Sequence, residues 1–105
     1  MKTAHDLLAV LTRHIGRGNG ITVQVLAEQL GTTERQVRAL VSELRMDGNA
    51  ICGHPRDGYY IADTPEELDE TCQFLRNRAM HSLQLESRLR KIPMPDLLGQ
   101  LHVPT

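Results

Sequence analysis

Two arginines three positions apart, Arg35 and Arg38, carry the most distinctive chemistry of this sequence. A guanidinium group is planar and permanently charged, and its N–H groups bond in pairs to flat acceptors such as carboxylates, phosphates and base edges. Residues three apart on a helix lie on one face. If the segment is helical, the two groups point the same way and can act on one acceptor surface.

The segment around these arginines predicts two short helices separated by a glycine turn. Before Gly31, apolar residues recur at helical spacing, at Val23, Leu26, Ala27 and Leu30. Gly31 is the expected stop, because left-handed backbone costs little without a Cβ. Thr33 and Gln36 fit a capping box, in which each side chain bonds the backbone N–H of the other residue. The second helix then buries Val37, Leu40, Val41 and Leu44, and it ends at Gly48.

The remaining elements follow from caps, glycines and prolines. A first helix starts after the Thr3 cap and carries an apolar stripe as far as Ile15, before the glycine-rich stretch 16–20. Short β-type runs at 50–52 and 59–62 surround a polar tip, which predicts a hairpin. A last helix starts near Pro65 and runs to about Ile92, because Pro93 and Pro95 prevent continuation.

The sequence therefore predicts a mainly α fold with a small β-hairpin. We expect three parts: a domain over residues 1–63, a long helix over 64–92, and a flexible tail over 93–105. The 105 residues suffice for one domain with an aliphatic core, because aromatic residues make up only 3% of the chain.

Two strings in this sequence resemble the winged helix-turn-helix domains of bacterial and phage regulators: LAEQLGTTERQVRALVSELRMDG and ICGHPRDGYYIA. The N-terminal domains of the biotin-repressor-like and DeoR-like proteins are the nearest comparison. The string GYYIADTPEELDETCQFLRNRA is similar to small winged-helix proteins encoded by phages and prophages. The resemblance covers about residues 3–90. It implies a winged helix-turn-helix, followed by a long C-terminal helix, that binds double-stranded DNA.

In such a domain the helix over 34–47 enters the major groove, and its first turns reach base edges. Either Arg35 or Arg38 can bond the O6/N7 edge of guanine, which is worth roughly 1–3 kcal/mol of discrimination. Gln36 can read adenine if it is not used in the cap. The candidate DNA-binding residues are Thr32, Thr33, Glu34, Arg35, Gln36, Arg38, Ser42, Arg45, His54 and Arg56. The alternative interpretation is a solvated face on which the arginines pair with Glu34 or Glu43.

The charge balance limits the affinity that we expect. Arg56 is the only fixed positive charge of the hairpin tip 53–58, which the resemblance places against the minor groove or the backbone. Asp57 stands beside it and would repel phosphate. Residues 32–60 contain four arginines and four acidic residues, and the whole chain has a net charge of −1. We therefore expect modest affinity from one copy and a need for avidity from a dimer.

The helix over 64–92 is acidic at its beginning and basic at its end, which suits the helix dipole. It carries an apolar stripe, Leu68, Cys72, Leu75, Ala79 and Leu83. We expect part of this stripe, with Cys72, to cover the core, and we expect Cys52 to be buried in a strand. The rest would pair antiparallel with a second copy through Leu75, Ala79, Leu83 and Leu89. Arg76, Arg78, Arg88 and Arg90 have a second use, contact with the DNA backbone, and the sequence does not choose between the two.

Neither a catalytic site nor a cofactor or metal site is predicted. The GRGNG stretch at 16–20 lacks the Lys-Ser/Thr ending of a nucleotide loop, and the five histidines are scattered. Two cysteines are too few for a disulfide scaffold. The sequence shows neither an apolar run long enough for a membrane span nor a secretory signal core. We expect a cytoplasmic protein that is not an enzyme.

Three functions fit these features. The expected one is a sequence-specific transcriptional regulator of phage, prophage or bacterial type. The first alternative is a phage replication or DNA-packaging accessory protein that binds DNA. The second is a winged-helix protein-interaction module, which the neutral charge balance favours.

Overall fold

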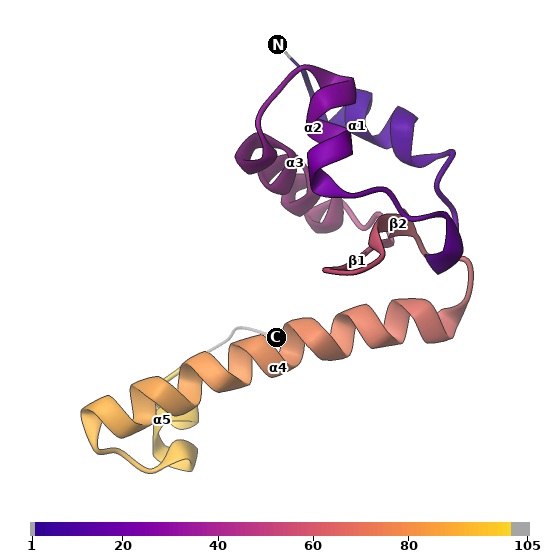
Figure 1. Ribbon diagram of the computed structural model, residues 1–105. Helices are drawn as coiled ribbons and strands as arrows, with labels where there is room; N and C mark the ends of the chain where they lie inside the picture. Colours follow the sequence, from indigo (N-terminus) through magenta and orange to yellow (C-terminus); the bar gives the residue numbers. More distant parts are fainter. Residues whose placement is uncertain (1, 102–105) are drawn as a thin grey trace. The chain divides into compact units, whose positions relative to one another are not determined.

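The computed structural model describes residues 2–101, which form helices and one two-stranded antiparallel sheet (Figure 1). The chain divides into two compact units, one up to Thr71 and the other from Cys72. The first unit contains α1 (Ala4–Leu11), a 3₁₀ turn η1 (Arg17–Asn19), α2 (Val23–Leu30), α3 (Glu34–Met46), β1 (Ile51–His54) and β2 (Gly58–Ile61). The helix α4 (Pro65–Arg90) begins in the first unit and ends in the second, which also holds α5 (Met94–Gln100). The predicted combination of helices and one hairpin is confirmed.

An aliphatic core joins α1, α2 and α3 to β1. Each helix places apolar residues about one turn apart on its inner side, and burying them stabilises the three-helix arrangement. The buried set is Leu7, Leu11, Ile21, Leu26, Ala27, Leu30, Val37, Leu40, Val41, Leu44 and Ile51. Every apolar residue predicted for the inner face of α3 is in this set.

Threonine caps define where the first three helices begin. Thr3 and Asp6 form a complete capping box, and the Thr3 backbone N–H and hydroxyl lower the pKa of Asp6. Thr22 caps α2, and the Thr33 hydroxyl accepts the Gln36 backbone N–H at 3.1 Å. Only this half of the box predicted at Thr33 is present among the described residues, because the Gln36 side chain makes no return bond.

The helix α1 is shorter than predicted. It ends at Leu11, and the hydroxyl of the next residue, Thr12, donates a hydrogen bond to the Ala9 carbonyl at 2.7 Å. Ile15 therefore does not belong to the helical stripe. It is 44% exposed and forms a bridge with Ile61 beside β2.

The strand β2 makes main-chain hydrogen bonds on both edges. On one edge it pairs with β1, with Cys52 opposite Tyr60. On the other, Tyr59 and Ile21 exchange backbone hydrogen bonds of 2.7 and 2.8 Å. Gly58 permits this approach, because its φ is 77° and a Cβ there would lie 2.4 Å from the Ile21 carbonyl oxygen. β2 is thus held on both edges within the first unit.

The start of α4 is joined to the rest of the first unit by Glu67. Its carboxylate accepts the Asp63 backbone N–H at 2.8 Å and the Arg17 backbone N–H at 3.1 Å, and these bonds lower its pKa. Its backbone carbonyl accepts the thiol of Cys52 at 3.5 Å. Thr71, one turn further along, is buried. This side of α4 is therefore the one that meets the core.

The predicted use of the apolar stripe to cover the core is wrong. Leu68 is 39% exposed, and Cys72 is exposed rather than buried. The reason is rotational: successive helix residues point about 100° apart, and the inner side of α4 carries Glu67 and Thr71. Cys52 is buried in β1, as predicted.

The second unit contains a helix where a tail was expected. Pro93 prevents continuation of α4, as predicted, and Lys91 takes a left-handed φ of 56° at the turn. The chain then forms α5, whose Leu97 is only 1% exposed. Residues 102–105 of the expected tail lie outside the described residues. Within residues 2–101, none of the helices has the combination of length and apolarity that crossing a membrane requires.

Replacing Leu40 by alanine tests the core. Leu40 is 5% exposed between α3 and its neighbours, and the loss of a buried leucine side chain should lower the free energy of unfolding by roughly 2–5 kcal/mol. Met46→Ala is the matched control on the same helix, because Met46 is 87% exposed, and it should change stability by no more than about 0.5 kcal/mol. Urea denaturation followed by circular dichroism measures both. Equal effects of the two variants would contradict this core.

The role of Glu67 predicts a dependence of stability on pH. A carboxyl whose pKa is lowered in the folded state adds stability above its ordinary pKa of 4.5, and this stability is lost as the pH falls through the folded-state pKa. Glu67→Gln should therefore lower the midpoint of thermal unfolding at neutral pH, and its difference from the wild type should shrink below pH 4.5. Glu66→Gln, on the same turn but exposed, should show little effect at either pH. A pH-independent deficit in Glu67→Gln would show that the carboxylate charge is not what matters.

Candidate nucleic-acid interface

The outer face of α3 carries the predicted arginine pair. Arg35 and Arg38 are both exposed, as are Glu34 and Ser42, whereas the side chains on the inner face of the helix are buried in the core. Because the core fixes the rotation of α3, it also fixes the direction in which these side chains leave the helix. The structure therefore brings the four residues onto one accessible surface.

Arg38 forms an ion pair with Glu34 one turn earlier, at 3.5 Å from Nη2 to Oε1. Both side chains are about half exposed, at 58% and 48%. A solvent-exposed pair of this spacing contributes about 0.3–0.5 kcal/mol, whereas a bidentate guanine contact is worth roughly 1–3 kcal/mol. The ion pair predicted by the alternative interpretation is present, but it is weak enough to open when a better acceptor arrives.

Arg45 differs from the other two arginines, because it is already engaged. Its Nε donates to the Ile51 carbonyl at 2.8 Å, and its guanidinium carbon lies 6.0 Å from the centre of the Tyr59 ring. A hydrogen bond from a charged donor contributes about 1.5–3 kcal/mol, as much as a base contact would. In this structure Arg45 ties α3 to the hairpin.

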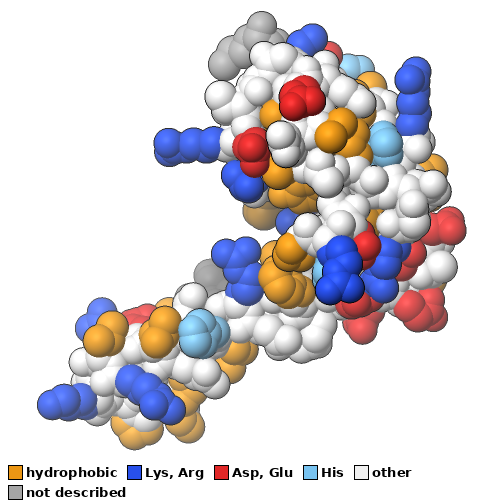
Figure 2. Space-filling model, in the orientation of Figure 1, with side chains coloured by type: hydrophobic (Ala, Val, Ile, Leu, Met, Phe, Trp, Pro, Cys, Tyr) orange, Lys and Arg blue, Asp and Glu red, His pale blue; other side chains and the backbone are white. Residues whose placement is uncertain are grey.

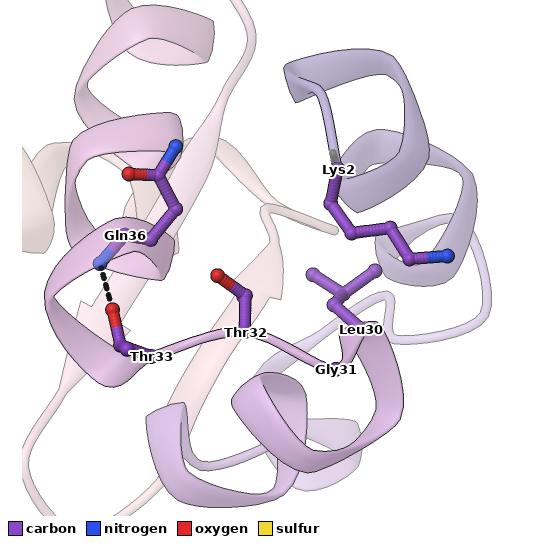
Figure 3. Close-up of a pocket in the computed structure, with 6 residues that line it drawn as sticks. All are labelled: Lys2, Leu30, Gly31, Thr32, Thr33 and Gln36. Carbon is purple, nitrogen blue, oxygen red and sulfur yellow. Dashed lines mark hydrogen bonds between the residues drawn. The ribbon is translucent and has the colours of Figure 1, made fainter.

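A shallow hollow of about 350 Å³ lies at the turn between α2 and α3. Figure 3 shows the Thr32 hydroxyl pointing into it, with Lys2 and Leu30 on one side and Gln36 on the other. The hollow combines a hydroxyl, an amide and an ammonium group at the start of a helix, where backbone N–H groups favour an anion. Thr32 and Gln36 were predicted as site residues. Lys2 was not, because it lies thirty positions away in the sequence.

The hairpin tip holds His54, Arg56 and Asp57. The Arg56 backbone N–H donates to His54 Nδ1 at 3.1 Å, which shapes the turn and leaves the Arg56 side chain exposed. His54 Nδ1 also lies 3.6 Å from the Asp57 carboxylate. Arg56 is therefore the cation that this tip presents to solvent among the candidate residues, as expected.

Arg17 reaches this region from η1 and was missing from the predicted set. Its Nε lies 3.7 Å from the Asp57 carboxylate, and its Nη2 bonds Glu70. The Tyr60 hydroxyl and the Glu70 carboxylate raise the pKa of Arg17. The negative charge of Asp57, which was expected to repel phosphate beside Arg56, is thus partly offset by Arg17.

No group of three histidine, cysteine, aspartate or glutamate side chains in the described part of the chain is placed to hold a metal ion. Comparison with known protein families, curated proteins and solved structures found no match to this chain.

Proposed function

We propose that this chain is a winged helix-turn-helix protein that recognises a specific sequence in double-stranded DNA, as a cytoplasmic transcriptional regulator of phage, prophage or bacterial type. In this proposal α3 lies in the major groove, and the β1–β2 hairpin is the wing. The observation that carries the proposal is the pair of exposed guanidinium groups, Arg35 and Arg38, on a helix whose rotation is fixed by its buried face.

The neighbouring groups fit the same docking. Thr32 and Lys2 in the hollow, with Thr33 at the helix start, suit a backbone phosphate, which would set the register of α3 along the duplex. Glu34 and Ser42 flank the arginines and lie where base edges or phosphates would pass. Arg56 at the wing tip supplies a cation for the minor groove or the adjacent backbone. Arg45 serves to position the wing in this arrangement.

A second candidate function is a winged-helix module that binds another protein. It is favoured by the charge of the first unit, in which seven Lys and Arg residues face eleven Asp and Glu residues, a net charge of −4. DNA binding loses affinity steeply as salt rises, because counterions are released from the phosphates. A protein-interaction module would show no preference for any duplex at any salt concentration.

The central test combines site selection with substitution of both arginines. A duplex enriched from random DNA by the wild-type protein should be bound in preference to a scrambled duplex. Arg35→Ala with Arg38→Ala should reduce that preference by tenfold or more, because each bidentate base contact is worth roughly 1–3 kcal/mol. Fluorescence anisotropy with both duplexes measures the ratio.

Two controls sharpen this test. Replacing the same two residues by lysine keeps both charges but removes the paired geometry, so non-specific affinity should remain while the preference falls. Arg13→Ala removes an exposed arginine outside the candidate set and should leave the preference unchanged. A double alanine variant that still selects the same duplex would place recognition elsewhere.

We also propose that the chain forms a homodimer through α4. Leu75 and Leu89 are 43% and 84% exposed, and Ala79 is exposed, while Leu83 is half-buried within the second unit. Leu75, Ala79 and Leu83 follow one another at four-residue spacing, which places them along one side of the helix. An antiparallel pair would set the acidic start of one α4 near the basic end of the other.

Sedimentation equilibrium tests the dimer. The wild type should sediment as a dimer at high protein concentration, and Leu75→Ser with Leu89→Ser should shift it towards a monomer, because α4 loses apolar surface. Met46→Ser is the control, since it removes an even more exposed apolar side chain from α3. A wild-type protein that stays monomeric throughout would exclude the dimer.

A further inference from the structure

The net charge of this protein is positive only outside the first unit. From Cys72 onward, five Lys and Arg residues face two acids, a net charge of +3, against −4 in the first unit. Figure 2 shows the same division along α4, with acidic side chains at its start and Lys and Arg side chains towards its end. The unit that carries the proposed recognition helix thus has a net negative charge, and the net positive charge lies in the other unit.

The helix dipole explains only part of this distribution. Its effect is confined to the last turn of a helix, where Arg88 and Arg90 lie, with Lys91 directly after them. Arg76 and Arg78 lie near the middle of α4, and both are exposed. Arg78 rests 6.0 Å from the Phe74 ring centre. Two cations in the middle of the helix therefore need another explanation.

Most cations of the second unit have no acidic partner among the described residues. In the first unit Arg17 pairs with Asp57 and Glu70, and Arg38 pairs with Glu34. Within the described part of the second unit, Arg90 pairs with Glu86 at 2.8 Å, and that is the sole ion pair. The other four cations are exposed to solvent: Arg76, Arg78, Arg88 and Lys91.

The four arginines of α4 point to opposite sides of the helix and do not form one basic face. Residues two apart on a helix point about 200° apart, so Arg76 and Arg78 leave opposite sides, as do Arg88 and Arg90. The two pairs are separated by about 18 Å along the axis, at 1.5 Å per residue. Cations on both sides at two levels suit the two phosphate rows that border a DNA groove. They do not suit a membrane surface, which needs all cations opposite one apolar face.

We propose that the second unit binds the phosphate backbone of double-stranded DNA through Arg76, Arg78, Arg88 and Arg90, and that it supplies most of the sequence-independent affinity. This inference rests on the proposed function, since it assumes that the chain binds DNA. It assigns base reading to α3 and charge neutralisation to α4. The acidic first unit then needs few phosphate contacts of its own.

The test is the salt dependence of binding to a duplex of random sequence, with the full chain. Each phosphate contact adds about 0.9 to the slope of log affinity against log salt. Replacing the four arginines by glutamine should lower the slope by about 3.6 and weaken binding to random and selected duplexes by the same factor. Replacing the four by lysine is the matched control, because it keeps the charges, and it should leave the slope unchanged. Circular dichroism checks that α4 stays helical, and sedimentation checks that association is unaltered.

The outcomes separate the two proposals. If the glutamine variant keeps the wild-type slope while the wild type still selects its duplex, the second unit does not contact phosphate and the proposed function stands. If the wild type binds no duplex at any salt concentration, both proposals fail. If the wild type shows no salt-dependent DNA binding but sediments with phosphatidylserine vesicles, and the glutamine variant does not, the cations serve a membrane surface and this inference is wrong.

Discussion

The burial of one face of α3 is the constraint on which the rest of the structure depends. Val37, Leu40, Val41 and Leu44 all lie in the aliphatic core, so the helix cannot rotate without exposing them to water. This fixes the direction of every side chain on the outer face. It also fixes where Arg45 leaves the helix, and Arg45 in turn holds the hairpin through the Ile51 carbonyl. The outer face of α3 and the hairpin are thus oriented by the same packing.

The features that the sequence predicted well are those encoded within one turn of the chain. Thr33 as a cap, Gly31 as a helix stop and Pro93 as a barrier are local signals, and each has the expected position. The inner face of α3 was predicted for the same reason, because its 3.6-residue period is visible in the sequence. The exposed pair of Arg35 and Arg38 follows directly from that face.

The features that the sequence did not predict depend on contacts between distant segments. Arg17 meets Asp57 and Glu70 across forty and more positions, and Lys2 comes to the turn before α3 only once α1 has packed. Glu67 accepts hydrogen bonds from the backbone N–H groups of Arg17 and Asp63. The side of α4 that carries Glu67 therefore meets the core, and the side that carries the leucine stripe does not. Periodicity identifies an apolar stripe but does not say what covers it. Cys72 was therefore expected in the core and lies outside it.

The bond from Arg45 to Ile51 has a consequence for aggregation. β2 is occupied on both edges, so β1 is the open edge of the small sheet, and an open edge can template strand addition from another molecule. The backbone N–H and C=O groups of Cys52 face Tyr60 in β2. Those of Ile51 and Gly53 therefore face away from β2. The guanidinium of Arg45 already occupies the Ile51 carbonyl, and the Ile51 N–H turns to Asn49. The side chain that orients the hairpin thereby also occupies one of the groups on this edge that could pair with a strand of another molecule.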